Sequence, residues 1–183
     1  MLFYTSDLKF HNFQNNYDFK FQQHPSAYIT PKELDRITHL IEKNFTIEYV
    51  THGAWSTHHV LEKVLMRTGK ADITIATWAI TEKPLKKLHK LKTLGLIGSL
   101  NGHFEEKIKK HHSKALSFAN ELFDSITFSK CHAKVMLVEN SDWNISIVTT
   151  SNWTTNKRTE VGILNCSMES VKFHKSWMKN QFN

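Results

Sequence analysis

The chain has 183 residues, of which 40% are hydrophobic, and its 24 Lys and Arg against 17 Asp and Glu give a formal net charge of +7. These figures fit one compact globular domain, and the low counts of six Gly and three Pro argue against a disordered or collagen-like chain. The two cysteines, Cys131 and Cys166, lack any CxxC spacing, so we expect reduced thiols without a disulfide framework. The chain contains no apolar run of about 18 residues and begins without a leader-like pattern, which predicts a cytoplasmic protein.

Positive charge is concentrated in the middle of the sequence. Residues 82–114 contain nine Lys against three Glu, whereas 1–81 contain eight basic and eight acidic residues and 115–183 contain seven and six. A local basic surface attracts polyanions, so nucleic acid is a physically reasonable partner. The stretch KPLKKLHKLK also fits the solvated face of an amphipathic helix, so charge alone leaves both interpretations open.

Strand and helix patterns alternate over the first two thirds of the chain. Thr30, Pro31 and Glu33 combine a capping residue, a proline at the first helical position and a capping-box glutamate, which predicts a helix to Lys43. The expected elements that follow are a strand at 46–52, a helix from Ser56 to Arg67, a strand at 71–80, a helix from Thr81 to before Gly95, a strand at 94–100 and a helix at 103–123. This rhythm is typical of a sheet covered by helices.

The last third of the chain changes to consecutive strands. We expect strands at 125–129, 131–139, 144–150 and 160–165, followed by a helix capped by Ser167. The main domain is expected to span 45–183, and residues 1–44 to form an N-terminal arm and helix packed on it. The aromatic and amide residues at 1–29 suit a packing strand better than an arm that stacks on exposed bases.

The residues that carry chemistry begin at His132 and Lys134. Residues two apart on a strand share a face, so these side chains should point together from one edge of the sheet. A neutral imidazole can attack phosphorus, and an adjacent ammonium can stabilise charge on phosphoryl oxygens.

Polar side chains also follow the next expected strand. Thr150 and Asn152 share parity, so their hydroxyl and amide groups can bind the same phosphate oxygens. Glu160 can orient the imidazole of His132 by accepting its second N–H.

These residues resemble the motif of the phospholipase D superfamily. HAKVMLVE fits His-x-Lys-x(4)-Asp, with Glu139 in the position of the aspartate. TTSNWTTNKRTE is similar to the companion stretch Gly-Ser-x-Asn-x-Thr-x-Asn-x-Arg-x-Glu, with Thr149 for Gly, Thr150 for Ser, and Asn152, Thr154, Asn156, Arg158 and Glu160 matching. The resemblance implies an α/β fold whose mixed β-sheet is flanked by helices on both faces.

The resemblance also implies an activity. In that superfamily two motifs meet in one site, where one histidine forms a phosphohistidine and the other protonates the leaving oxygen, and neither metal nor another cofactor is needed. This sequence has one convincing motif. The pair His112 and Lys114 lies in an expected helix, where residues two apart diverge. Similarity to single-motif members therefore implies a homodimer with His132 from each copy in a shared site.

Three departures from the pattern affect the predicted roles. Glu139 is longer than Asp and has the opposite parity to His132, so it is expected to stabilise the structure or the dimer, as are Thr149 and Asn156. Thr150 keeps the hydroxyl of Ser. Thr149 replaces a glycine, which is expected to affect phosphate affinity or activity.

Further residues are candidates for binding substrate. His52, Thr77 and Trp78 lie at expected strand ends, and Lys107 belongs to the basic middle of the chain. An exposed His52 and a core Trp78 are equally compatible with the pattern. The pairs at 58–59 and 111–112 are histidines, but their spacing does not form a zinc-ligand set, so we predict no metal site.

The sequence thus predicts a dimeric, metal-independent phosphodiesterase that acts on nucleic acid, with DNA preferred over RNA. A phospholipase is the alternative with the same chemistry, although the sequence offers no anchor or clear apolar lipid-binding face. A catalytically weak nucleic-acid-binding or regulatory module with the same fold is the alternative without hydrolysis.

Overall fold

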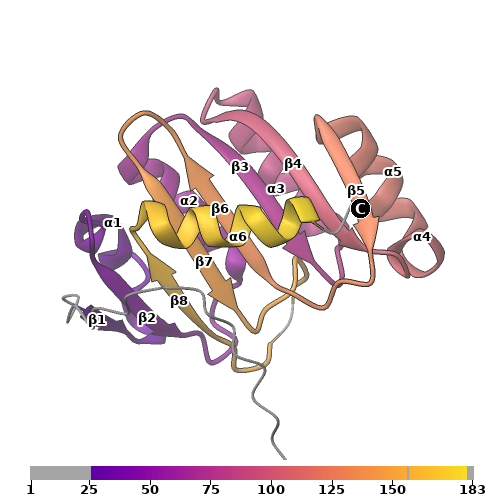
Figure 1. Ribbon diagram of the computed structural model, residues 1–183. Coiled ribbons are helices and arrows are strands. Elements are labelled where there is room, and N and C mark those ends of the chain that lie inside the picture. The colour runs from indigo at the N-terminus through magenta and orange to yellow at the C-terminus, as the bar shows by residue number, and fades with distance from the viewer. Residues whose placement is uncertain (1–25, 156, 181–183) are drawn as a thin grey trace, which may run out of the picture.

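The structure is a computed structural model that describes residues 26–155 and 157–180 (Figure 1). The elements are β1 (Ser26–Ile29), η2 (Pro31–Glu33), α1 (Arg36–Leu40), β2 (Thr46–Val50), α2 (Thr57–Thr68), β3 (Ala71–Thr77), α3 (Glu82–Thr93), β4 (Ile97–Glu105), α4 (Ile108–His111), α5 (Ser113–Leu122), β5 (Ser125–Ser129), β6 (Val135–Glu139), β7 (Asn144–Thr149), β8 (Val161–Asn165) and α6 (Met168–Asn180).

The strands form one mixed eight-stranded sheet in the order β1-β2-β8-β7-β6-β3-β4-β5. The pairs β1–β2, β3–β4 and β4–β5 are parallel, and the four pairs from β2 through β8, β7 and β6 to β3 are antiparallel. Strand β1 belongs to the predicted N-terminal arm and pairs with β2. The rest of that arm, residues 1–25, lies outside the described residues.

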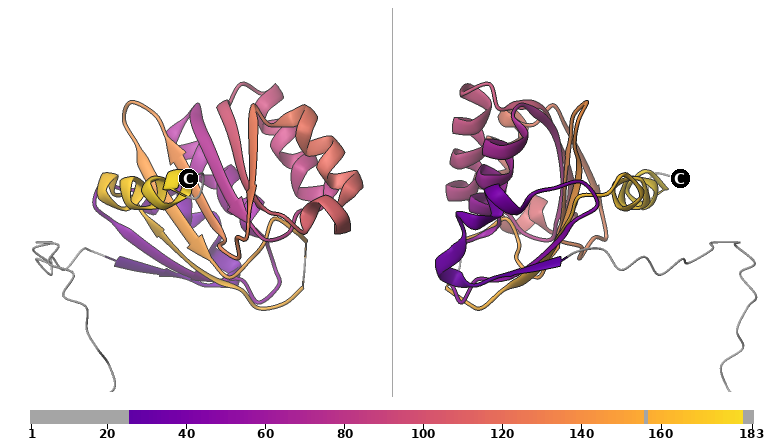
Figure 2. Two further views of the ribbon diagram at one scale, coloured as in Figure 1. Left: turned by 45° about the vertical axis from the view of Figure 1, so that its right-hand side comes forward. Right: turned by 90° about the vertical axis from the view of Figure 1, so that its left-hand side faces the viewer.

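Helices cover both faces of the sheet, which confirms the predicted α/β fold class. Helices α1 to α5 lie on one face, and α6 alone crosses the other (Figure 2). The crowded face holds the main core, where apolar side chains of α2 and α3 pack against alternate strand residues. Leu61, Leu65, Leu85 and Leu88 from the helices and Ile73 and Ile147 from the strands are fully buried there. A smaller cluster forms under α6 around Leu137, Val171 and Met178.

Two predicted helices differ from the structure. The prediction of a helix at 103–123 was wrong for its first residues. Residues 103–105 belong to β4, which continues to Glu105 and pairs there with β5. His103 and Glu105 are polar but buried, and polar residues in the sequence do not suggest a buried strand. The His103 ring is satisfied by the hydroxyls of Thr127 and Ser129, at 3.0 and 2.9 Å. The remaining segment divides at His112 into α4 and α5.

The helix expected from Thr30 to Lys43 is also shorter than predicted. Its start is correct, because Thr30 and Glu33 form the capping box. The chain then makes a 3-10 turn and a helix of five residues that ends at Leu40.

Strand β6 is also shorter than the strand expected at 131–139. It begins at Val135, so His132 and Lys134 precede it instead of belonging to it.

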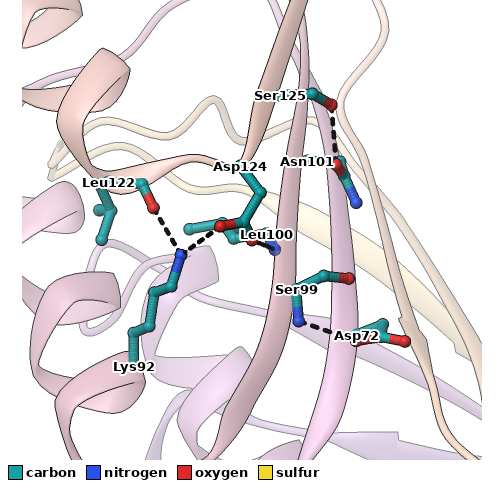
Figure 3. Close-up of polar contacts among 8 residues, drawn as sticks. All are labelled: Asp72, Lys92, Ser99, Leu100, Asn101, Leu122, Asp124 and Ser125. Atoms are coloured by element: carbon teal, nitrogen blue, oxygen red, sulfur yellow. Dashed lines mark hydrogen bonds and ion pairs between the residues drawn. The ribbon is translucent and has the colours of Figure 1, made fainter.

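The sheet end where β3 and β4 begin is held by polar contacts between side chains and backbone (Figure 3). The Asp124 carboxylate accepts hydrogen bonds from the Leu100 amide at 2.7 Å and from Lys92 Nζ at 2.8 Å. These donors, Lys92 first, hold the pKa of Asp124 below its ordinary value. Asp72 accepts a hydrogen bond from the Ser99 amide at 2.8 Å. This end therefore uses its charges to fix the strands and α3.

None of the helices in the described part of the chain is long and apolar enough to cross a membrane.

Candidate active site

The candidate residues gather because four chain segments meet at the other end of the sheet. Strands β6 and β7 are antiparallel, so the segment before Val135 meets the end of β7. The end of β7 in turn meets the start of β8, and the end of β3 meets the start of β6. Backbone hydrogen bonds from the Thr149 amide to Lys134 O and from the Thr150 amide to Val161 O, both at 3.0 Å, join these segments.

His132 and Lys134 contact each other directly. The Lys134 ammonium donates to the backbone carbonyl of His132 at 2.7 Å and lies 3.3 Å from its ring nitrogen Nδ1. An ammonium has no acceptor, so in this arrangement Nδ1 is the acceptor and the hydrogen of a neutral ring lies on Nε2. Burial lowers the pKa of Lys134, while the nearby Cys131 and Glu160 act in the opposite direction. The imidazole itself is exposed.

Thr150 and Glu160 form a second pair across the β7–β8 junction. The Thr150 hydroxyl donates to Glu160 Oε2, and it accepts the Val161 amide at 3.1 Å. The backbone of Glu160 is fixed by Thr51: its carbonyl accepts the Thr51 amide at 2.8 Å, and its amide donates to the Thr51 hydroxyl at 3.0 Å. The backbone bonds to Thr51 and the side-chain bond to Thr150 therefore hold Glu160 beside the candidate phosphate-binding residues.

Thr77 and Asn152 form a third pair. The buried Thr77 hydroxyl donates to Ala79 O at 3.0 Å and lies 3.4 Å from Asn152 Oδ1. It also accepts the Trp153 amide at 3.3 Å. Thr77 thus positions the loop that carries Asn152, and its burial places it behind the surface that meets solvent.

Trp78 lies beside the histidine. Its ring centroid is 5.6 Å from that of His132, and the side chain is 39% exposed. Lys107 lines a pocket together with Trp78. His52 is exposed and its Nδ1 lies 3.2 Å from the Thr159 hydroxyl, in the loop that leads to Glu160. Of the two interpretations of Trp78, core or surface, the structure supports the surface one.

Of the residues expected to have structural roles, Glu139 is separated from this cluster, whereas the Thr149 backbone belongs to it through its bond to Lys134 O. Glu139 lies at the opposite end of β6, where it forms an ion pair of 3.0 Å with Lys175 of α6. Thr149 pairs with Gly162, and a side chain on that glycine would clash with the Tyr49 ring, since an added Cβ would lie 2.3 Å from it. Asn156 lies outside the described residues.

Sequence reasoning missed one residue that holds the candidate histidine in place. The buried Glu105 carboxylate accepts a hydrogen bond of 2.7 Å from the Cys131 amide, directly before His132. Glu105 was expected within the helix at 103–123, which gave it no place near the motif. Had β4 been extended, Glu105 would have been placed at a strand end beside the motif.

Across residues 26–155 and 157–180, no three His, Cys, Asp or Glu side chains are grouped closely enough to hold a metal ion.

No protein-family model and no curated protein sequence matches the chain. Solved structures do match its fold. NucT from Helicobacter pylori has a TM-score of 0.55 at 10% identity over 75% of this chain and 96% of that one. Nuc from Salmonella typhimurium, a phospholipase D family member, has a TM-score of 0.55 at 16% identity over 75% and 93%.

A longer protein contains the same fold. Phosphatidylserine synthase from Haemophilus influenzae matches with a TM-score of 0.53 at 14% identity over 75% of this chain, which corresponds to 38% of that protein. The chain therefore has a phospholipase D-like fold, as the motif predicted.

Proposed function

We propose that the protein is a phosphodiester hydrolase that acts on nucleic acid through a phosphohistidine at His132. The observation that carries the proposal is the contact between the exposed imidazole and the Lys134 ammonium, at the junction that also holds Thr150 and Glu160. The phospholipase D-like fold supports the same chemistry, because the segment with His132 and Lys134 meets the end of β7 and the start of β8 at one end of its sheet.

The first chemical step is an exchange of bonds at phosphorus. When a phosphodiester binds, Lys134 moves its hydrogen bonds from His132 to the non-bridging oxygens, which frees Nδ1 to take the ring hydrogen and leaves Nε2 unprotonated. The Nε2 lone pair forms the N–P bond while the P–O bond to the leaving group breaks. The leaving oxygen takes a proton from His132 of a second copy of the chain.

The second step returns the enzyme to its starting state. Water attacks phosphorus, the N–P bond breaks, and the water proton passes to the same histidine of the second copy. The products are an alcohol and a phosphate monoester. Asn152 assists both steps by donating its amide N–H to phosphate oxygens. The Thr150 hydroxyl donates to Glu160 in the free protein, so it contributes once its hydrogen turns from Glu160 to a phosphate oxygen.

An exposed apolar face supports the dimer that this mechanism needs. Helix α6 covers only part of its side of the sheet (Figure 2). Beside it, Tyr28, Val148, Val161 and Ile163 remain exposed and line a hollow of about 600 Å³ that extends to Thr150. Helix α6 itself exposes Phe173. In the dimer that we propose, a twofold axis relates the copies so that α6 of one packs over the exposed strands of the other and His132 of both copies enters one site.

Nucleic acid is the preferred substrate because of where the charge lies. The lysine-rich segment 82–114 includes Lys107 and His111, which border the Trp78 side of the site. Basic side chains next to the nucleophile favour a polyanion over a diester with a single charge. Much of the remaining charge of this segment is spread over α3, where Lys92 lies at the other end of the sheet. DNA is expected to be preferred over RNA.

Cleavage assays in excess EDTA test this function. We expect wild-type protein to cleave labelled single- or double-stranded DNA, His132→Ala to be inactive, and the control His39→Ala, which removes an exposed histidine of α1, to retain activity. Nucleic-acid binding without hydrolysis by the wild type would instead support the binding module. Hydrolysis of phospholipid vesicles alone would support the phospholipase.

The dimer is tested separately. Sedimentation should show wild-type dimers and Ile163→Glu monomers, because the charge would be buried in the proposed interface. A folded wild-type monomer with full activity would contradict the shared site.

A further inference from the structure

A second pocket lies directly beside the candidate nucleophile. Trp78, Lys107, Ile108, His111 and His112 enclose about 280 Å³ between the end of β3 and the short helix α4. Two distant segments of the chain therefore build the pocket, and the proposed reaction does not use it. Its composition is one aromatic ring, one apolar side chain and three basic groups.

Trp78 connects this pocket to the reacting position. The same indole that lines the pocket lies 5.6 Å, centroid to centroid, from the His132 ring. Because Trp78 is 39% exposed, part of its surface is available to a ligand. A planar group stacked on Trp78 would therefore lie beside a phosphate attacked by His132.

The opposite wall of the pocket is basic. Lys107 and His111 are exposed, His112 is half-buried, and the fully buried Ile108 anchors the α4 turn beneath them. The neighbouring Lys109 is already used elsewhere, because its ammonium lies 4.3 Å from the Phe128 ring centroid. The pocket thus combines a surface for a flat apolar group with donors for a phosphate on the far side.

We propose that this pocket is a nucleotide subsite that takes one unpaired base of the substrate against Trp78 and the adjoining phosphate against Lys107 and His111. The inference rests on the proposed function and makes it more specific. A base in a duplex is stacked on its neighbours on both sides, so its faces cannot reach the indole. The substrate class is therefore single-stranded nucleic acid, or duplex with an unpaired nucleotide beside the scissile bond.

The test compares binding of two oligonucleotides in the His132→Ala background, where no cleavage occurs. The first is a fluorescent single-stranded oligonucleotide with ordinary bases. The second has the same length and label, but every nucleotide in it is abasic. Trp78→Ala should weaken binding of the first on the order of 10-fold and leave the second unchanged. Trp78→Phe should restore most of the loss, and Met66→Ala, which truncates an exposed side chain of α2, should have no effect.

The pair of ligands separates stacking from damage to the fold, because a misfolded variant would lose both. Equal loss on both oligomers, or no loss on either, would overturn the subsite. Lys107→Ala should weaken both oligomers by a similar factor, since phosphate contacts do not depend on the base. The proposed function is tested independently by hydrolysis of methyl p-nitrophenyl phosphate by the wild type, so either claim can fail alone.

Discussion

The two ends of the sheet use the same residue types for different purposes. At the end where β3 and β4 begin, Lys92, Asp124 and Asp72 bind backbone groups and one another (Figure 3). At the other end, Lys134 donates to a histidine that is itself exposed, and Glu160 accepts from a hydroxyl that faces solvent. The charges at the first end are held by backbone amides, carbonyls and one ion pair, which stabilises the strands. Lys134 also binds a backbone carbonyl, but it and Glu160 have exposed side-chain partners, whose place a ligand can take. Mutations at the two ends should therefore separate activity from stability.

The largest effect is expected from His132→Ala. If this histidine forms the covalent bond, turnover should fall on the order of 10³-fold or more, and the melting temperature should stay unchanged because the ring is exposed. Steady-state rates and thermal melts of the same preparations measure both. A comparable loss of thermal stability would place His132 with the structural charges instead.

Lys134→Met should come next. The substitution keeps the length of the side chain but removes the ammonium, so turnover should fall on the order of 10²-fold through lost stabilisation of phosphoryl charge. Binding of a product monoester should weaken as well. Full activity in this variant would show that the contact with Nδ1 only orders the free protein.

The pH profile should report Lys134. Burial lowers its pKa from the ordinary 10.5, and the active form is the ammonium, which is lost as pH rises through the lowered pKa. The value of kcat/KM should therefore begin to fall at a lower alkaline pH than an exposed lysine would give. Lys134→Arg should move this limb upward because guanidinium keeps its proton. An unchanged limb would assign it to another group.

Asp124→Asn should affect stability and leave turnover intact. The amide keeps an acceptor for Leu100 but loses the charge opposite Lys92, so we expect about 1 kcal/mol lower stability in urea unfolding. The pKa of Asp124 is lower in the folded state, so the difference should be present at neutral pH and disappear as pH falls through that lowered pKa. A difference that grew in acid would contradict this origin.

Glu139→Gln should give the smallest effect. Its ion pair with Lys175 is partly exposed, so the loss should lie within about 0.5 kcal/mol, and turnover should not change. A strong loss of activity would show that Glu139 affects the geometry of the site at the other end of β6.

The sequence was most informative where chemistry and spacing coincide. The interval between His132 and Lys134 predicted side chains that point together, and the two are in contact although both precede β6. The contact of Thr150 with Glu160 was not predicted. The sequence was less informative where polar residues are buried. His103 and Glu105 look like helix surface in one dimension, because their partners come from β5 and from the segment before His132.

Contacts between distant segments were beyond sequence reasoning for the same reason. Trp78 could be recognised as a strand-end residue, but its position against His132 depends on the antiparallel pairing of β3 with β6. Glu160 was predicted to orient the imidazole, and its described side-chain partner is Thr150. The orientation of the imidazole by Glu160 stays a prediction.

The most direct test of the account is to trap the proposed intermediate. Wild-type protein is mixed with a diester labelled with ³²P, quenched in alkaline detergent during turnover, and mapped by peptide mass. We expect a phosphorylated peptide that contains His132, that is stable in alkali and lost in acid, and that is absent in His132→Ala. Steady turnover in EDTA without any such adduct, or an adduct on another residue, would contradict the phosphohistidine mechanism.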